Sequence, residues 1–238
     1  MNNNIYNFLP KKGSKIAFLT GAGVSTHSGI PDFRSDTGVY ATNKAKILSW
    51  QHFHEKPKEF YNFFFNSLYH PDKKPNIVHN TIKELEKDYD VFVITQNVDG
   101  FHTEAGSSNV IEFHGNSQYV ACTRKCSFRE PTKNWIDFLL DKNTSNSCPV
   151  CKRGKIKPDV VLFGEQGTHF TNKSLDLIRK EMISASSVFV LGTSLQVYPF
   201  ASFTDYKHKH ISGVIVSKNP PNREGYVSYD MDLADFLK

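Results

Sequence analysis

The 238-residue sequence contains no run of about 18 apolar residues, the length that a membrane-spanning helix requires. Its first 13 residues, MNNNIYNFLPKKG, lack the apolar centre of a secretory leader. Charge of one sign does not dominate, because the chain has 29 Lys and Arg and 24 Asp and Glu. The basic residues are scattered apart from a few short clusters. A nucleic-acid groove is therefore the minority interpretation. We expect a soluble, cytoplasmic protein with no membrane or specific nucleic-acid partner, and we favour a monomer.

The sequence also lacks the third glycine of a dinucleotide-binding fingerprint. A β-type run at residues 15–20 leads into the sequence GAG at residues 21–23, which opens like a loop that offers backbone N–H groups to a pyrophosphate. Thr26 stands where the third glycine should be, and Pro31 would break the helix that should follow. The loop therefore predicts a dinucleotide site but argues against a dehydrogenase.

Short β-rich runs alternate with helical patterns along most of the chain. Several of the runs are continuously apolar, which is typical of parallel strands buried on both faces. The runs lie at residues 15–20, 91–95, 109–113, 160–163, 188–191 and 213–216, and the clearest helical patterns at 76–88, 173–183 and 231–238. Alternation of this kind predicts a doubly wound α/β fold.

Two segments do not fit this alternation. Residues 44–75 are aromatic-rich and read as helical, whereas residues 119–157 contain all the cysteines. We expect both to form a small lobe inserted into a large one. The large lobe would then comprise residues 1–43, 76–118 and 158–238.

Cysteine is scarce, with four residues in two close pairs: Cys122, Cys126, Cys148 and Cys151. In a reducing compartment such pairs favour tetrahedral zinc over disulfides. Four sulfur ligands leave no open position for water, so the predicted zinc is structural. Buried or redox-active thiols are the alternative. A nucleic-acid zinc ribbon is disfavoured because the intervening TKNWIDFLLDK reads as a packed helix.

Polar residues follow three of the predicted strands. Because ligands of α/β proteins bind outside the carboxyl ends of the strands, these residues are expected to line one crevice with the glycine loop. They are Gln96, Asn97 and Asp99 after the second run, His114 at the end of the third, and Gly192, Thr193 and Ser194 after the fifth.

The stretches GAGVSTHSGIPDFRS, TQNVDGFHTEAG, the HG pair, the two cysteine pairs, KPDVVLFGE and GTSLQVYPF occur in this order. Together they resemble the sirtuin (Sir2) family of NAD-dependent protein deacylases, bacterial type, over about residues 14–237. The resemblance implies a Rossmann-like parallel sheet with a small zinc-binding and helical lobe inserted. It also implies that NAD is consumed as a co-substrate and that the partners are acyl-lysine proteins.

The resemblance further implies which residues contact NAD. Phe33 would shield the reactive C1′ face, and Arg34 would meet phosphate or order the loop. Either Ser217 or Asn219 would contact the adenine ribose, since the family usually has Asn directly after that strand. The full expected set is Gly21, Ala22, Gly23, Thr26, Asp32, Phe33, Arg34, Gln96, Asn97, Val98, Asp99, His114, Gly192, Thr193, Ser194, Ser217, Asn219 and Asp232.

His114 and Asn97 are the expected catalytic residues. After nicotinamide departs, His114 would take a proton from a ribose hydroxyl, a role that suits an imidazole near neutral pH. The products would be nicotinamide, free lysine and O-acyl-ADP-ribose. His102 is the rival base, whereas His79 is expected to pack or cap a helix. A protein ADP-ribosyltransferase and a catalytically silent ADP-ribose-binding module are the alternative functions.

The family's peptide-binding edge corresponds to Val161, Phe163, Gly164 and Glu165, with Val197 and Tyr198 opposite. Backbone pairing there would give affinity with little sequence selectivity. Family members that remove acidic acyl groups carry Tyr-x-x-Arg, whereas this chain has Tyr61 and then Phe64. An acidic acyl group would lack a partner, so we expect acetyl or a longer apolar acyl group. The alternative is that these aromatic residues belong to the core.

Overall fold

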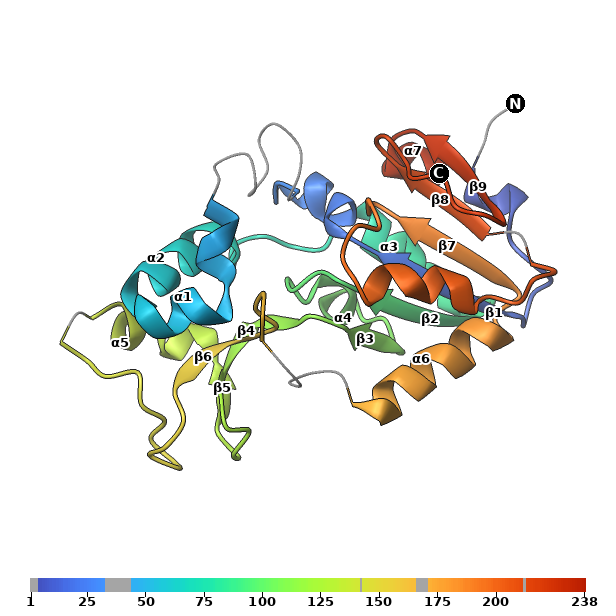
Figure 1. Cartoon of the computed structure of the whole chain (residues 1–238). Helices are drawn as coiled ribbons and strands as arrows, with labels where there is room; N and C mark the ends of the chain where they lie inside the picture. The colour runs from blue at the N-terminus through green and yellow to red at the C-terminus, as the bar shows by residue number, and fades with distance from the viewer. Residues whose placement is uncertain (1–3, 33–43, 142, 166–170, 212) are drawn as a thin grey trace.

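The computed structural model describes residues 4–32, 44–141, 143–165, 171–211 and 213–238. Its larger sheet is wholly parallel, with the strand order β3-β2-β1-β7-β8-β9 (Figure 1). The strands are β1 (Lys15–Thr20), β2 (Asp90–Thr95), β3 (Val110–Glu112), β7 (Ser187–Leu191), β8 (Gly213–Ser217) and β9 (Tyr226–Asp230). The order reverses between β1 and β7, which is where α/β folds of this kind bind ligands.

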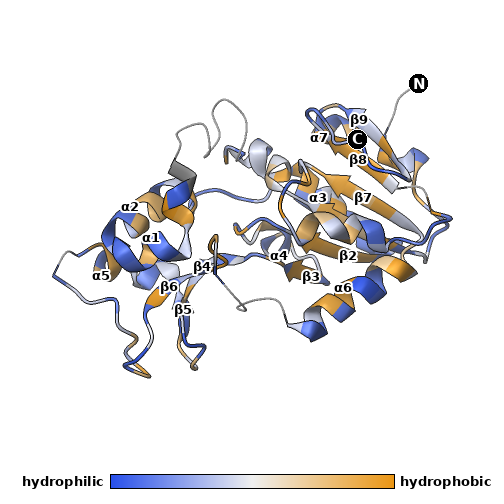
Figure 2. Cartoon of the chain, in the orientation of Figure 1, coloured by the Kyte–Doolittle hydropathy of each residue, from blue (hydrophilic) through white to orange (hydrophobic). Residues whose placement is uncertain are grey.

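Both faces of this sheet are covered, which explains the continuously apolar strands. Ile16 and Phe18 pack with α3 (Ile77–Glu84) and α7 (Leu233–Phe236) on one face. Ala17 and Leu19 pack with α6 (Asn172–Ser184) and η7 (Phe200–Tyr206) on the other. Successive side chains of a strand point to opposite faces, so a strand covered twice is apolar throughout. Figure 2 shows the resulting hydrophobic strands at the centre of this layer.

A smaller antiparallel sheet, in the order β5-β4-β6, lies at the other side of the molecule (Figure 1). It shares one hydrophobic cluster with the helices beside it, and the cluster includes Phe53, Phe60, Phe64, Val120 and Ile156. The elements are β4 (Gly115–Cys122), β5 (Arg129–Pro131), β6 (Ile156–Val160), η4 (Lys44–Leu48), α1 (Trp50–Glu55), α2 (Pro57–Ser67) and α5 (Ile136–Leu140).

Local signals set the ends of several helices. Asn76 caps α3 by accepting a 2.8 Å hydrogen bond from the N–H of Val78, and Ser49 and Thr171 cap α1 and α6 in the same way. The remaining short helices are η1 (Ile5–Asn7), η2 (Ala22–Ser28), η5 (Leu85–Lys87), α4 (Phe101–Glu104) and η6 (Thr132–Asn134). Within the described ranges, no helix has the length and apolar character needed to cross a bilayer.

The expected fold class is confirmed, with two differences in its strands. The run at residues 160–163 was expected in the parallel sheet, but only Val160 lies in a strand, β6, which is antiparallel to β4. The sequence patterns also failed to predict β9 and β4. β9 is an edge strand whose side chains are half-buried or exposed, and β4 begins with polar residues, so neither has a continuous apolar run.

Candidate functional site

The glycine loop packs directly against the turn that follows β7. The N–H of Gly23 donates to the carbonyl of Gly192 at 2.9 Å. A Cβ on Gly23 would lie 2.7 Å from the Gly192 Cα, and Gly192 itself has a φ of +64°, so both positions require glycine. The loop continues as η2, a short 3-10 helix that contains Ala22 and Thr26 and ends at Ser28, with Gly29 as its left-handed cap. The backbone at the β1–β7 switch point is thereby held close together.

A buried polar network joins the glycine loop to the segment after β2. The Asn97 side chain donates to the carbonyl of Gly21 and to Ser25 Oγ, both at 3.1 Å. Ser25 in turn donates to Asp99 at 2.7 Å, and burial raises the pKa of Asp99. Sequence reasoning missed Ser25, because its hydroxyl acquires a role only through partners more than 70 residues away in the chain.

A second bridge links the ends of β2 and β7. Gln96 Nε2 donates to Thr193 Oγ1 at 3.0 Å, and the same oxygen accepts from the N–H of Leu195 at 3.1 Å. Ser194 follows at a half-buried position. Ser217 is the last residue of β8, the strand next to β7 in the sheet. Its buried Oγ has no hydrogen-bond partner among the described residues. An unsatisfied buried hydroxyl is costly unless a ligand or water meets it.

His114 follows β3 and turns its imidazole toward the segment after β2. Its Nδ1–H donates to the carbonyl of Gln96 at 3.1 Å. Burial lowers the pKa of His114, while this hydrogen bond opposes the shift. The neutral ring therefore carries its proton on Nδ1 and a lone pair on Nε2.

The other two buried histidines of this region belong to the core. His102 Nε2 lies 3.0 Å from Thr20 Oγ1, and the His102 ring packs 4.8 Å from the His79 ring. His79 Nδ1 accepts from the N–H of Asn76 and completes the cap of α3, as the sequence predicted. Neither imidazole lines the cavity that His114 lines.

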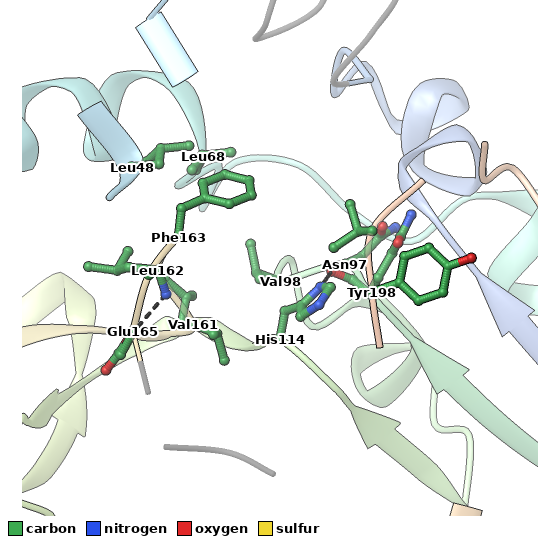
Figure 3. A pocket seen from close by; sticks show the side chains of 14 residues that line it. Leu48, Leu68, Asn97, Val98, His114, Val161, Leu162, Phe163, Glu165 and Tyr198 are labelled. Carbon is green, nitrogen blue, oxygen red and sulfur yellow. Dashed lines mark hydrogen bonds between the residues drawn. The ribbon is translucent and has the colours of Figure 1, made fainter. Parts of the chain in front are cut away.

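A cavity of about 270 Å³ lies between the two sheets (Figure 3). His114 and Asn97 stand at one end of it, and Leu48, Leu68 and Phe163 at the other. Its full lining is Leu48, Leu68, Gln96, Asn97, Val98, His114, Val160, Val161, Leu162, Phe163, Gly164, Glu165, Val197 and Tyr198. The structure therefore brings four sequence motifs together, namely TQNV, HG, VVLFGE and GTSLQVYPF. Leu48 and Leu68 were not expected, since no pattern distinguishes a cavity-lining leucine from a core one.

The structure places two of the expected substrate-binding residues in the core and outside the cavity lining. Tyr61 and Phe64 do not line the cavity; both side chains are fully buried in the hydrophobic cluster beside the smaller sheet. Tyr61 donates its hydroxyl to the carbonyl of Ile156, and Phe64 stacks on Phe60 at 5.9 Å between ring centroids. Helical spacing placed them on the core side of α2, which is the alternative that the sequence left open.

The remaining expected cofactor-binding residues lie outside the described residues or away from the two bridges. Phe33 and Arg34 lie outside the described residues, and Asp32 is the last described residue before that gap. Asn219 has a left-handed backbone with a φ of +49° two residues after β8. Asp232 caps α7 by accepting from the N–H of Ala234 and lies 3.0 Å from His27 Nε2, so other groups already occupy its carboxylate.

The four cysteines converge at one end of the smaller sheet. All four sulfur atoms lie within 4.8 Å of one another. Cys122 and Cys151 are 3.6 Å apart, as are Cys126 and Cys148. Tetrahedral zinc with Zn–S distances of about 2.3 Å separates its sulfur ligands by roughly 3.8 Å, so this geometry fits the metal.

The surroundings of these sulfur atoms also favour metal binding. Backbone N–H groups of Arg153 and Gly154 lower the pKa of the Cys151 thiol, which favours the thiolate that zinc binds, whereas burial raises the pKa of the Cys122 thiol. Cys148 is buried within the cluster that holds α2. The four ligands are all sulfur, which is the composition of a structural zinc site rather than a catalytic one.

Comparisons with known proteins agree with this geometry. The Sir2 family profile matches residues 21–199. An NAD-dependent protein deacetylase of Listeria monocytogenes is 38% identical over 211 residues, covering 87% of this chain and 86% of that protein. A solved structure of Sir2 with a p53 peptide and NAD+ has a TM-score of 0.78 at 34% identity, covering 93% and 90% of the two chains. Another, with deacetylated p53 peptide and 3′-O-acetyl-ADP-ribose, has a TM-score of 0.80 at 33% identity, covering 93% and 90%. This chain belongs to the Sir2 family.

Proposed function

We propose that this protein is an NAD-dependent protein-lysine deacetylase that cleaves NAD and transfers the acyl group from lysine to ADP-ribose. One observation carries the proposal: the imidazole of His114 and the amide of Asn97 meet an apolar cavity at the carboxyl end of the parallel sheet. The deacetylase relatives and the Sir2 complex with acetyl-ADP-ribose support it.

The residues at the switch point fit NAD. Glycine backbones after β1 and β7 allow close approach of a pyrophosphate, and Thr193 and the unsatisfied hydroxyl of Ser217 suit the adenosine end. Asn97 and Asp99, tied together through Ser25, suit the nicotinamide ribose and carboxamide. Bound NAD supplies an electrophilic ribose carbon and a leaving group, nicotinamide.

His114 acts as the general base. Its Nδ1–H is fixed on the Gln96 carbonyl, so Nε2 is the nitrogen that can accept a proton from a ribose hydroxyl. Because burial lowers the pKa of His114, the ring is neutral and competent at neutral pH. The acyl oxygen would take the place of nicotinamide on the ribose carbon, and the activated hydroxyl oxygen would then attack the acyl carbon. A water molecule would replace the lysine nitrogen on that carbon, so lysine leaves as the free amine and the acyl group stays on ADP-ribose. The products are nicotinamide, lysine and O-acetyl-ADP-ribose.

The acyl-lysine chain occupies the cavity. Leu48, Leu68 and Phe163 surround the acyl group, and residues 161–165 with Val197 and Tyr198 bind the peptide backbone. Among the residues that the structure describes, no Lys or Arg lines the cavity, which favours acetyl over acidic acyl groups. Residues 44–75 and 119–157 together form the small lobe, which the structural zinc stabilises. The need for four reduced thiols supports a cytoplasmic location.

The proposal is tested by comparing the amount of nicotinamide released with the amount of lysine deacetylated. Purified protein with NAD and an acetyl-lysine peptide is expected to release one nicotinamide for each lysine deacetylated, and no deacetylation should occur without NAD. Peptide deacetylation that proceeds without NAD, or nicotinamide release with no loss of acetyl groups, would contradict the proposal.

A further inference from the structure

Lys157 and Glu165 form a buried ion pair at the wall of the cavity, which Glu165 lines and Lys157 supports. The Lys157 side chain is 5% exposed and the Glu165 side chain 1%, and Nζ lies 3.3 Å from Oε2. Removing two charges from water is unfavourable, and a well-packed apolar pair of similar volume often gives equal or greater stability. Stability alone therefore gives no reason for ionic groups at this position.

Each charge also binds the backbone of the segment that lines the cavity. The Lys157 ammonium donates to the carbonyls of Pro158 and Val160. Glu165 Oε2 accepts from the N–H of Leu162 at 2.9 Å, and the Glu165 N–H donates to the Leu162 carbonyl at 3.0 Å (Figure 3). The pair thus ties the end of β6 to the turn that follows it.

The alternate residues of the same segment are fixed from the other side. The N–H of Val161 donates to the carbonyl of His114 at 2.9 Å. The N–H of Phe163 donates to Leu48, and the carbonyl of Phe163 accepts from Trp50. Among the described residues, the Val161 carbonyl and the Gly164 N–H are left without a hydrogen-bond partner. An acceptor and a donor on one extended segment are what a peptide strand needs for pairing.

We propose that Lys157 and Glu165 are positioning residues for the acyl-lysine peptide, a role that rests on the proposed deacetylase function. The ammonium holds the Val160 carbonyl and the carboxylate holds the Leu162 N–H, so the unpaired groups of Val161 and Gly164 are presented in a fixed geometry. An apolar pair could fill the same space, but it could not hold these backbone groups. Neither residue takes part in the chemical step.

Three variants and one control separate this role from a merely structural one. Lys157→Met and Glu165→Met each leave one buried group without its charged partner, whereas the double variant removes both charges and both side-chain bonds to the backbone. Arg129→Met is the matched control, because Arg129 pairs with Asp159 of the same strand β6 but does not line the cavity. Both single variants should melt at a lower temperature than the wild type, and the double variant should recover most of that loss.

The kinetic constants should not recover in the same way. We expect the KM for peptide to rise at least tenfold in both single variants and to stay high in the double variant. The KM for NAD and the kcat should remain within about threefold of the wild type, and Arg129→Met should change none of them. A double variant that melts normally and has the wild-type KM for peptide would overturn the proposal.

Amide hydrogen exchange tests the same claim without substrates. Exchange at the Leu162 and Glu165 amides should accelerate at least tenfold in the double variant, while amides of β1 and β7 keep their protection. Unchanged exchange at Leu162 would overturn the positioning role even in a fully active enzyme. A wild-type protein that lacks deacetylase activity would instead overturn the proposed function, whatever the exchange result.

Discussion

The Nδ1–H of His114 donates to the backbone carbonyl of Gln96 across 3.1 Å. This bond joins the end of β3 to the end of β2, two strands that are neighbours in the parallel sheet. It decides which imidazole nitrogen is basic, because a carbonyl oxygen can only accept. The proton-accepting nitrogen is therefore set by the fold before any substrate binds.

The first prediction concerns the pH dependence of the reaction. Burial lowers the pKa of His114, and the base works only in its neutral form, so activity should persist below the ordinary histidine pKa of about 6.5. The acidic limb of kcat/KM should have its midpoint below that value. The measurement is a pH–rate profile with an acetyl peptide that contains no histidine or carboxylate side chain. A midpoint at or above 6.5 would show that burial does not control this base.

The second prediction concerns acyl specificity. No cationic side chain of the described ranges lines the cavity, so a buried succinyl carboxylate would cost several kcal/mol. Wild-type protein should therefore remove acetyl at least about 100-fold faster than succinyl, since every 1.4 kcal/mol is about tenfold. Parallel kcat/KM values for two peptides that differ only in the acyl group measure this ratio.

Two arginine variants test which side chain lies against the acyl group. Leu68→Arg places a cation at the cavity lining and should raise the succinyl-to-acetyl ratio at least tenfold. Phe64→Arg should instead lower the melting temperature without creating desuccinylase activity, because Phe64 is fully buried in the core. A stable Phe64→Arg protein that removes succinyl would return Phe64 to the acyl site.

The third prediction concerns the metal. One zinc per chain should be found by elemental analysis, and Cys148→Ser should lose it. Because Cys148 lies in the cluster that holds α2, β4 and β6, metal loss should disorder that cluster and abolish peptide binding. Amide protection in β1 and β7 should persist, since these strands pack in separate clusters. A metal-free protein with both sheets fully protected would contradict a structural role for zinc.

The fourth prediction concerns acid stability. Burial lowers the pKa of His79 to about 4, whereas an unfolded histidine titrates near 6.5. Between these values the unfolded chain binds a proton that the folded chain does not. The free energy of unfolding should therefore fall as the pH drops below about 6.5, by up to about 3 kcal/mol from this group.

Urea unfolding at several pH values between 5 and 7.5 checks this expectation. His79→Leu should lose less stability per pH unit than the wild type, by about 1 kcal/mol per unit. Acid effects on the cysteine cluster are common to both proteins and cancel in the difference. Parallel curves for the two proteins would mean that His79 does not carry the acid sensitivity.

Four of the predicted strands of the parallel sheet, namely β1, β2, β7 and β8, are buried on both faces, and a continuous apolar run reports that environment well. The fifth, β3, is a half-buried edge strand. β9 was missed because an edge strand keeps polar and exposed side chains. The run at residues 160–163 was misassigned because a cavity lining and a buried strand select the same residue types. The local sequence pattern does not show whether an apolar side chain faces a cavity or packs in the core.

In the candidate site, too, the sequence predicts some residues and not others. Gln96, Asn97 and His114 could be named from the sequence because each follows a strand, and the cavity gathers all three. Ser25 and Leu68 could not be named, because their roles depend on contacts between segments far apart in the chain.

The measurement that tests the central claim most directly is mass spectrometry of the products from protein, NAD and an acetyl-lysine peptide. Wild-type protein should give O-acetyl-ADP-ribose and free peptide. His114→Ala should lower their rate of formation by about 10²- to 10⁴-fold, the usual contribution of a general base, while retaining the wild-type melting temperature. Peptide that gains the mass of ADP-ribose, or full activity in the folded His114→Ala variant, would contradict the account.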